Sequence, residues 1–361
     1  MLKQSWKRWT LGLLAGVAIL LCACAGVVYA VDPCFYYRAP EGDASFFNER
    51  YQDAGLAKNI PADTVLLGTS MVANYRAGRV AETFGGTAVK LTIPDGYLSE
   101  FDRVMTVVWR NGTPKRVVFG ADVNIFTRDE SGLTGAMPDY LYDANPLNDV
   151  KYLLNKDTLY YSVYTQMERR WGSARPLDEA FTWDTTTWWN HQKALDNYDR
   201  PEIAAAALPS DAYFDNVDAN LKVLERWITA HPDTEFDLFF PPYSILFWDK
   251  VQRLGESEAV FAAMERVCDA LVPYGNVKLY GFVMDRDIVT NLDNYCDYIH
   301  HSGAVCDRVL SLMAADQDRL TPENARQTIA KWRDFVVYYD YNAYWDPSFW
   351  IQWNRTHPAP A

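Results

Sequence analysis

Strand-like and helix-like segments alternate over residues 64–119, and this alternation limits the possible folds more than any other feature of the sequence. Strands are predicted at 64–67, 88–93 and 116–119, and helices at 72–84 and 99–110. Because strand–helix–strand units form parallel sheets with helices on both faces, we predict an α/β fold with three layers, α/β/α, and a parallel sheet. Ligand sites in such folds lie at the carboxyl ends of the strands.

The same alternation resumes after residue 208. Helices are predicted at 215–229, 256–271 and 305–313, and strands at 235–240 and 277–282. Residues 127–208 interrupt the pattern, are rich in aromatic residues and proline, and are longer than most connections in compact α/β units. We predict that they form an inserted, mostly helical cap. Its aromatic side chains either pack within the cap or bind sugar rings.

Ser70 follows the first predicted strand in the sequence Gly68-Thr69-Ser70. Gly68 permits a sharp turn, which would place the serine at the carboxyl edge of the sheet and at the start of the next helix. Free N–H groups at a helix N-terminus can stabilise an oxyanion, so Ser70 is a candidate nucleophile. The alternative is that Ser70 is a helix N-cap without a chemical role.

A second candidate group lies far later in the chain. Asp297 and His300 are three residues apart, so on one turn the carboxylate can reach the imidazole ring. A carboxylate in this position fixes the tautomer of a histidine that acts as a base. We therefore predict that His300 is a general base and that Asp297 orients it.

Three short motifs of the sequence resemble those of the SGNH (GDSL-type) hydrolases. They are Gly68-Thr69-Ser70 after the first strand, Gly96 after the second strand, and Asp297-x-x-His300 near the end of the α/β pattern. The resemblance covers about residues 35–315 and is to membrane-anchored SGNH-like proteins of Gram-positive bacteria, and more distantly to the D-alanyl transfer protein of teichoic-acid modification. It implies an SGNH-hydrolase or flavodoxin-like sheet, with Ser70 as the nucleophile and Gly96 as an oxyanion-hole donor.

The sequence departs from the family pattern after the third strand. The usual Gly-x-Asn-Asp block is missing, and Gly120-Ala121-Asp122-Val123-Asn124 stands in its region. Asn124 is therefore the candidate for a further oxyanion-hole donor. Asp122 has two alternative roles, which are substrate binding and a structural hydrogen bond.

The resemblance implies an extracytoplasmic serine esterase or acyltransferase that requires no cofactor. Its expected substrates are ester-linked acyl groups, of the acetyl or D-alanyl type, on a cell-envelope polysaccharide or a teichoic-type polymer. A membrane acyltransferase is a candidate partner. The alternative from another class is a non-catalytic, membrane-anchored envelope protein that binds glycans or protein partners.

An uncharged, mostly apolar stretch runs from Leu11 to Val31 after the basic residues Lys3, Lys7 and Arg8. It has about the 20 residues needed to cross a bilayer, and its basic flank predicts a single-pass membrane anchor with the C-terminal domain outside the cytoplasm. The alternative is a signal sequence that is cleaved at Val28-Tyr29-Ala30, which predicts a secreted protein.

The predicted organisation has four parts. They are an anchor or signal segment at 1–31, a stalk at 32–58, an SGNH-like α/β domain at 59–320 with the cap at about 127–208, and a C-terminal helix with an aromatic tail at 321–361. A chain with this organisation would present its candidate site on the outer side of the membrane.

Composition and motif content argue against some partners and cofactors. The formal net charge of -13, without a dense basic run, argues against nucleic-acid binding. The sequence has no CxxC pair and no HExxH motif, so no metal site is predicted. Cys34, Cys268, Cys296 and Cys306 would meet an oxidising exterior. Cys296 and Cys306 either form a disulfide that braces the turn between them or remain buried thiols.

Overall fold

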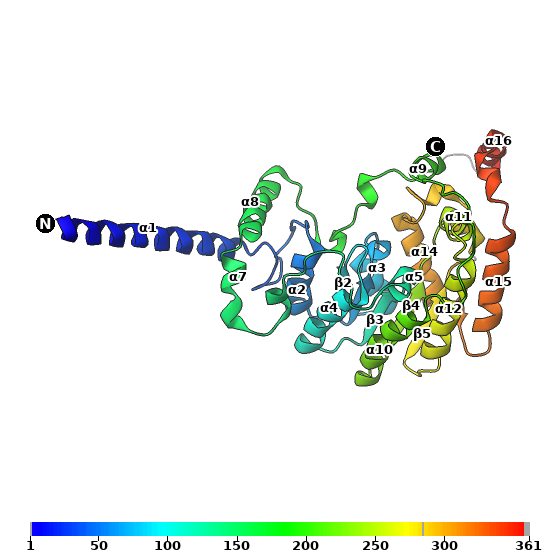
Figure 1. The fold of residues 1–361 in the computed structure, drawn as a ribbon, viewed down its shortest axis with the longest axis horizontal. Helices are drawn as coiled ribbons and strands as arrows, with labels where there is room; N and C mark the ends of the chain where they lie inside the picture. The colour runs from blue at the N-terminus through cyan, green and yellow to red at the C-terminus, as the bar shows by residue number, and fades with distance from the viewer. Residues whose placement is uncertain (1, 284, 357–361) are drawn as a thin grey trace. The chain divides into compact units, whose positions relative to one another are not determined.

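The computed structural model describes residues 2–283 and 285–356 and has an α/β fold (Figure 1). Six strands of the described residues form one sheet in the order β2-β1-β3-β4-β5-β6. The strands are β1 (Thr64–Gly68), β2 (Ala88–Thr92), β3 (Arg116–Gly120), β4 (Glu235–Phe240), β5 (Val277–Gly281) and β6 (Arg319–Leu320). The chain divides into two compact units: unit 1 comprises residues 1–119 and 131–182, and unit 2 comprises residues 120–130 and 183–361.

Most of the strand pairs are parallel. In unit 1, β1 pairs in parallel with both β2 and β3, with Leu67 opposite Leu91 of β2. In unit 2, β4 pairs in parallel with β5, whereas β6 is antiparallel to β5. These pairings confirm the predicted α/β class with a mainly parallel sheet. The strand β6 has only two residues, which is too short to leave a periodic pattern in the sequence.

Helices pack against β1 and β2 in unit 1. Helix α2 (Glu49–Asn59) contacts β2 and α4 (Leu98–Asn111), and α3 (Ala77–Phe84) contacts both strands. All residues of β1 are buried, as expected for a parallel strand that is covered on both faces. The apolar side of α4 packs on the sheet through Phe101, whose ring centroid lies 5.6 Å from that of Phe119 in β3.

Three long helices pack together in unit 2. Helix α12 (Ser257–Leu271) contacts α10 (Phe214–Ala230) and α15 (Ala325–Tyr338). Helix α11 (Ile245–Arg253) follows β4 and also contacts α12; its buried Trp248 stacks on Phe261 at 5.2 Å between ring centroids. The remaining helices of unit 2 are α5 (Val123–Thr127), α9 (His191–Asp196), α13 (Arg286–Val289), α14 (Gly303–Ala314) and α16 (Pro347–Thr356).

Residues 127–208 contain helices and no strand. In unit 1 they form α6 (Asp139–Tyr142), α7 (Val150–Leu153) and α8 (Lys156–Trp171), and in unit 2 they form α9. Short 3₁₀ segments lie here and elsewhere, at η1 (Ser70–Val72), η2 (Pro146–Asn148), η3 (Leu177–Glu179), η4 (Asp184–Thr186), η5 (Leu292–Asn294) and η6 (Tyr341–Trp345).

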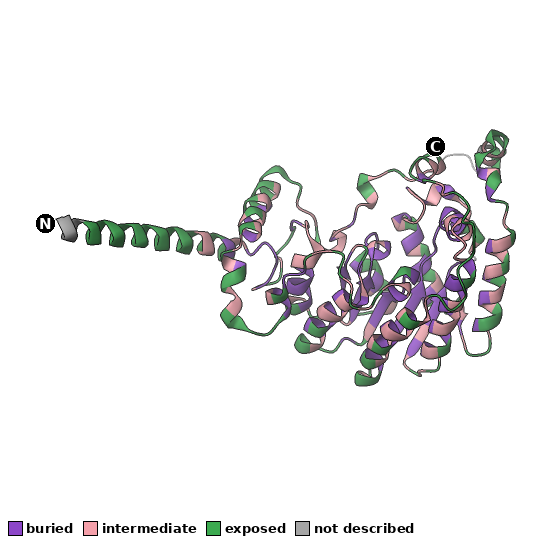
Figure 2. Cartoon of the chain, viewed as in Figure 1, coloured by how far each residue is buried: buried purple, intermediate pink, exposed green. Residues whose placement is uncertain are grey.

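The N-terminal helix α1 (Leu2–Val31) contains an apolar stretch, Trp6–Val31, that is long enough to span a membrane or to be a signal sequence. It is exposed along most of its length (Figure 2). Its C-terminal end differs, because α1 contacts α7 and α8 and Val28 is fully buried. The end of α1 is therefore part of the packed structure of unit 1.

The segment predicted to be a stalk, residues 32–58, is packed into unit 1. Cys34, Phe35 and Tyr36 are buried, and so is most of α2. The Asp32 carboxylate closes a turn by accepting hydrogen bonds from the backbone N–H groups of Tyr36, Tyr37 and Arg38. It also accepts one from the hydroxyl of Tyr152, at 2.8 Å. Unit 1 thus holds this segment through aromatic packing and one buried carboxylate.

Gly55 allows the close approach between α2 and the segment after α1. A Cβ atom at this position would lie 2.0 Å from the backbone oxygen of Cys34. Alanine is favoured over glycine inside a helix by about 1 kcal/mol, but overpacking a rigid contact costs about 1–3 kcal/mol and the neighbour here is backbone. We therefore expect Gly55→Ala to lower the free energy of unfolding of the full-length protein in detergent, measured by denaturant titration.

Gly112→Ala is the matched control, because a Cβ atom there would meet no atom within 4 Å. Its free energy of unfolding should stay within about 0.5 kcal/mol of the wild type. Equal stability of the two variants would show that the contact at Gly55 does not constrain unit 1.

Candidate active site

Ser70 lies directly after β1, at the carboxyl end of that strand. It is the first residue of the 3₁₀ segment η1, and the N-cap of this segment is Thr69, whose Oγ1 accepts a hydrogen bond from the N–H of Met71 at 3.3 Å. Ser70 is therefore not a helix N-cap. The α-helix α3 begins only at Ala77, so the predicted helix at 72–84 is shorter and Ser70 does not stand at its N-terminus.

A buried lysine binds the chain between η1 and the start of α3. Lys90 in β2 is 2% exposed, and its Nζ donates hydrogen bonds to the backbone oxygens of Ala73 and Tyr75, the latter at 2.6 Å. These two carbonyl groups are therefore directed at an ammonium group instead of at helical N–H groups. The turn after Ser70 is thus fixed by a side chain from the neighbouring strand.

Gly96 lies in the turn that follows β2, next to the end of β1. Its N–H donates a hydrogen bond to the backbone oxygen of Ile93 at 2.9 Å. A Cβ atom at position 96 would lie 2.8 Å from that same oxygen and 2.8 Å from Cζ of Phe101. Close packing therefore requires glycine here, and its N–H takes part in closing the turn.

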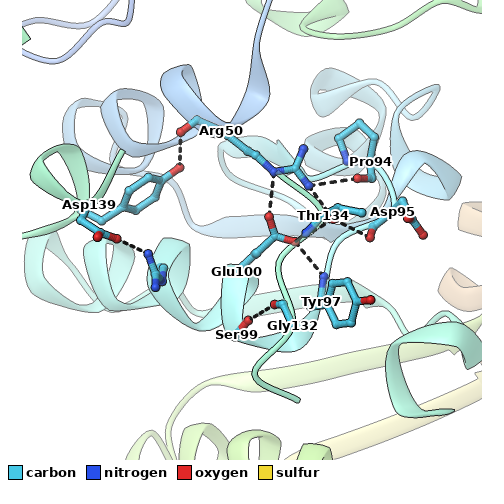
Figure 3. A network of polar contacts seen from close by, with 11 residues as sticks. Arg50, Pro94, Asp95, Tyr97, Ser99, Glu100, Gly132, Thr134 and Asp139 are labelled. Carbon is cyan, nitrogen blue, oxygen red and sulfur yellow. Dashed lines mark hydrogen bonds and ion pairs between the residues drawn. The ribbon is translucent and has the colours of Figure 1, made fainter. Parts of the chain in front are cut away.

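A buried ion pair holds the turn that contains Gly96 (Figure 3). The side chain of Glu100 is inaccessible to solvent, and its Oε1 lies 2.7 Å from Nε of Arg50. Its Oε2 accepts hydrogen bonds from the N–H of Tyr97 at 3.0 Å and from the hydroxyl of Thr134 at 2.9 Å. Arg50 also donates to the backbone oxygen of Pro94 at 3.2 Å. The pair thus fixes both ends of the turn.

These contacts determine the charge state of Glu100. Burial alone would raise the pKa of Glu100, but the hydrogen bonds from Arg50, Tyr97 and Thr134 and the charge of Arg50 hold its pKa below the ordinary value. Glu100 is therefore ionised at neutral pH. Sequence analysis does not identify this pair, because Arg50 and Glu100 are 50 positions apart and no local pattern connects them.

In unit 2, Asp297 and His300 form the predicted contact. Oδ2 of Asp297 lies 2.6 Å from Nδ1 of His300, and Oδ1 accepts hydrogen bonds from the backbone N–H groups of Ile299 and His300, both at 2.8 Å. The loop is closed by the N–H of Cys296, which donates to the backbone oxygen of His300 at 3.2 Å. The carboxylate is therefore fixed by the same turn that carries the imidazole ring.

The environment of this pair favours an ionised carboxylate. Burial alone would raise the pKa of Asp297, but the hydrogen bonds from the His300 ring and from the two backbone N–H groups hold its pKa below the ordinary value. The adjacent His301 differs, because burial lowers the pKa of His301 to about 4. His301 is therefore neutral, and its Nδ1 lies 3.6 Å from Sγ of Cys306.

Aromatic side chains from residues 183–189 contact His300. The ring of Trp183 meets the His300 ring edge-on at 5.3 Å between centroids, and Trp189 stacks on Trp183 at 5.4 Å. The adjacent Asp184 accepts a hydrogen bond from the N–H of Gly303 at 2.7 Å, which ties this segment to the start of α14. The imidazole ring thus has an aromatic wall that is anchored beside it.

Asp122 makes hydrogen bonds within the fold, as the structural one of its two alternative roles requires. It is 5% exposed, and its Oδ1 accepts hydrogen bonds from the N–H of Asn124 at 3.2 Å and from the hydroxyl of Tyr243. That hydroxyl also accepts the N–H of Val123 at 3.0 Å. Asn124 itself is exposed at the rim of a cavity of about 240 Å³, which Lys250 and Tyr298 also line.

Unit 2 contains a second histidine–aspartate pair that sequence analysis does not predict. Nδ1 of His191 lies 2.7 Å from Oδ1 of Asp293, and the imidazole ring stacks on Trp350 at 4.0 Å between centroids. The two residues are 102 positions apart, so spacing alone cannot reveal the pair. The His191–Asp293 pair therefore offers an internal control for experiments on the Asp297–His300 pair.

The candidate residues are distributed over both units. Ser70 and Gly96 belong to unit 1, and Asp122, Asn124, Asp297 and His300 belong to unit 2. Cys296 is a free, buried thiol, so the disulfide with Cys306 is not formed. Among the residues that the structure describes, no group of three or more His, Cys, Asp or Glu side chains is arranged to hold a metal ion.

Comparisons with known proteins give little further information. No protein-family model matches the chain, and no curated protein matches it. Among solved structures, a match comes from a Streptococcus pneumonia protein described as a candidate platelet activating factor, with 12% identity, coverage of 74% of this chain and 90% of that chain, and a TM-score of 0.39. This score is too low for the likeness to support a shared fold or activity.

Removing the cation of the buried ion pair should destabilise unit 1 strongly. Arg50→Met leaves the Glu100 carboxylate buried without its partner, so we expect the free energy of unfolding at neutral pH to fall by about 3–5 kcal/mol. Because the folded-state pKa of Glu100 lies below its unfolded value, this contribution is present above about pH 4 and is lost as the pH falls through the folded value. Denaturant titrations at several pH values measure both effects.

Arg103→Met is the matched control in the same unit. Arg103 pairs with Asp139 at the surface, where the side chains are 37% and 81% exposed, so its loss should cost less than about 1 kcal/mol. If Arg50→Met and Arg103→Met lose similar amounts of unfolding free energy, the buried Arg50–Glu100 pair is no more important for stability than a surface pair.

Tyr243→Phe tests the structural role of Asp122. The substitution removes the hydroxyl that binds the buried carboxylate and the N–H of Val123, so we expect a loss of about 1–3 kcal/mol in the free energy of unfolding. Tyr274→Phe is the control, because the half-buried Tyr274 hydroxyl makes no hydrogen bond to a described residue. If Tyr243→Phe and Tyr274→Phe have the same free energy of unfolding, the hydrogen bonds of Asp122 do not stabilise the fold.

Proposed function

We propose that this protein is an SGNH-like serine esterase or acyltransferase whose catalytic residues are Ser70, His300 and Asp297. The observation that carries the proposal is the pair in which an ionised Asp297 holds Nδ1 of His300 at 2.6 Å. This arrangement is what a histidine base needs in order to present its other nitrogen to a serine hydroxyl. Ser70 supports the proposal through its place at the carboxyl end of β1, where α/β folds carry their sites.

The proposed reaction is a two-step acyl transfer. Nε2 of His300 takes the proton of the Ser70 hydroxyl while Oγ forms a bond to the ester carbonyl carbon. Collapse of the tetrahedral intermediate breaks the ester C–O bond, and His300 returns the proton to the leaving alcohol. Water or a polymer hydroxyl then attacks the acyl-serine and gives its proton to His300. His300 passes this proton to Oγ of Ser70 as the bond between the acyl carbon and Oγ breaks. Asp297 stabilises the imidazolium that forms in both steps.

The proposed substrates are ester-linked acetyl or D-alanyl groups on a cell-envelope polysaccharide or a teichoic-type polymer. The aromatic wall of Trp183 and Trp189 beside His300 supports this class, because sugar rings stack on such surfaces. The apolar helix α1 supports a location at the membrane, with the domain on the outer side and with a membrane acyltransferase as a candidate partner. In this proposal residues 127–208 act as the cap of a three-layer SGNH-like domain.

One observation favours a second candidate function, a non-catalytic envelope protein that binds glycans or proteins. The N–H of Gly96 donates to the backbone oxygen of Ile93, and the N–H of Asn124 donates to Asp122. Both backbone N–H groups therefore have partners within the fold, whereas the side chain of Asn124, with its amide N–H groups, is exposed. Loss of one such donor costs about 10²–10³ in rate, so a chain without them would be a poor enzyme.

A serine-directed fluorophosphonate probe distinguishes the two functions. The full-length protein in detergent should be labelled at Ser70, and Ser70→Ala should abolish the label. His300→Ala should slow labelling by at least about 10²-fold, because the base that activates the serine is lost. Peptide mass spectrometry and the time course of labelling give the site and the rate.

His191→Ala is the matched control, because it removes the imidazole ring of the other histidine–aspartate pair. Its labelling rate should stay within about twofold of the wild type. Labelling that persists in Ser70→Ala, or that falls equally in both histidine variants, would overturn the assignment. A folded wild-type protein that is not labelled would favour the binding function. Release of acid from a panel of acetylated and alanylated envelope polymers then identifies the acyl group.

A further inference from the structure

Helix α8 has the reverse of the side-chain distribution that a helix of a water-soluble domain shows. Its buried residues are small and polar, namely Thr158, Ser162 and Thr165. Four of its exposed residues are large and apolar or aromatic, namely Tyr160 at 65%, Val163 at 53%, Met167 at 43% and Trp171 at 70% exposure. These four residues recur at helical spacing and form one stripe, which we call the α8 stripe. The other exposed residues of α8 are polar or charged, namely Lys156, Gln166, Arg169 and Arg170.

The position of α8 connects the stripe with the membrane. Helix α8 packs against α1, the apolar helix that is long enough to span a bilayer, and α7 does so as well. Figure 2 shows exposed residues along α8. Just before α8, Leu147, Val150 and Leu154 are also exposed, at 87%, 52% and 41%. The exposed apolar surface of α1 therefore continues onto the elements that pack on it.

The composition of α8 matches a helix that lies in the membrane interface. Residues 158–167 carry no charge, whereas the helix ends with Arg169, Arg170 and Trp171. Its 16 residues would extend only about 24 Å, which is shorter than the hydrocarbon core, so α8 is suited to lie on a bilayer and not to span it. Small residues between packed helices and aromatic residues at the boundary are typical of membrane proteins.

Polar groups on the side of α8 opposite the stripe line a cavity at the end of α1. Thr165 is 4% exposed, and its hydroxyl has no hydrogen-bond partner among the described residues. It lines a cavity of about 230 Å³ between the end of α1 and α8, together with Arg38, Arg169 and the exposed Glu41. Arg169 makes no ion pair with a described residue. Arg38 pairs with Asp32, which also lines the cavity, and donates to the backbone oxygen of Tyr29, so Arg169 is the guanidinium group that a lipid phosphate would meet there.

We propose that α8 lies in the interface of the membrane that α1 enters, with the α8 stripe in contact with lipid acyl chains and Arg169 beside headgroup phosphates. Helix α8 then serves as a second membrane contact of unit 1. A second copy of the chain is the other occupant that could cover the stripe, but the continuity with α1 and the interfacial composition of α8 favour lipid.

Photolabelling with lipid tests the proposal on the full-length protein. The protein is reconstituted in vesicles of equimolar phosphatidylcholine and phosphatidylglycerol that contain phosphatidylcholine with a diazirine in its acyl chain. After illumination, trypsin releases α8 as peptide 157–169 and most of α1 as peptide 9–38. We expect lipid adducts on both peptides, and within 157–169 on Tyr160, Val163 and Met167 and not on Thr158, Ser162 or Thr165.

A matched pair of variants tests the stripe itself. The double variant Val163→Asp, Met167→Asp should reduce labelling of peptide 157–169 at least about fivefold and leave peptide 9–38 unchanged, because each buried charge opposes insertion. Gln166→Asp adds one such charge about a third of a turn from the centre of the stripe and should leave labelling unchanged.

Two results would overturn the proposal. One is a wild-type protein in which peptide 9–38 is labelled and peptide 157–169 is not, which is also the result expected if a second copy covers the stripe. The other is labelling of Thr158, Ser162 and Thr165 at the level of the α8 stripe, which would mean that α8 unfolds on the vesicle. The wild-type measurement decides the proposal even if the double variant fails to fold.

Discussion

The position of β1 between two parallel partners is the constraint from which the candidate site in unit 1 follows. Because β1 pairs with β2 on one side and with β3 on the other, its residues are buried on both faces and its carboxyl end cannot move independently. Ser70 leaves the sheet at this end. The neighbouring strand supplies both the turn with Gly96 and the Lys90 side chain that shapes the chain after Ser70.

Much of the fold could be predicted from the sequence, since short apolar segments and helical periodicity are local signals. The strands at β1, β3, β4 and β5 and the helices α4, α10 and α12 lie within one or two residues of their predicted bounds. The contact between Asp297 and His300 was predictable for the same reason, because three residues on one turn suffice to bring the groups together. These are the features that depend on near neighbours in the chain.

The features that could not be predicted depend on partners far apart in the chain. In the sequence, Lys90 is a single charged residue within an apolar strand. In the structure, its ammonium group binds the backbone oxygen of Tyr75, just before α3 begins at Ala77. Arg50 lies in a segment whose sequence resembles a stalk, and its buried partner Glu100 lies 50 positions further along the chain. The His191–Asp293 pair likewise has no local signature. A single sequence indicates which segments are regular, but not which buried charges meet.

Three buried carboxylates in this protein are held by an ion pair or by several hydrogen bonds, which offset the cost of burying them. Glu100 has Arg50 and two further donors, Asp297 has His300 and two backbone N–H groups, and Asp32 has three backbone N–H groups and the hydroxyl of Tyr152. These carboxylates fix loops at the site and at the end of α1.

The burial of Val28 at the end of α1 bears on the biogenesis of the protein. Helix α1 continues without a break to Val31, and unit 1 packs against its last turns. A peptidase needs an extended, accessible backbone, so any cut after Ala30 would have to occur before unit 1 folds. A folded unit 1 would therefore protect this site, because the last turns of α1 are part of its packed structure.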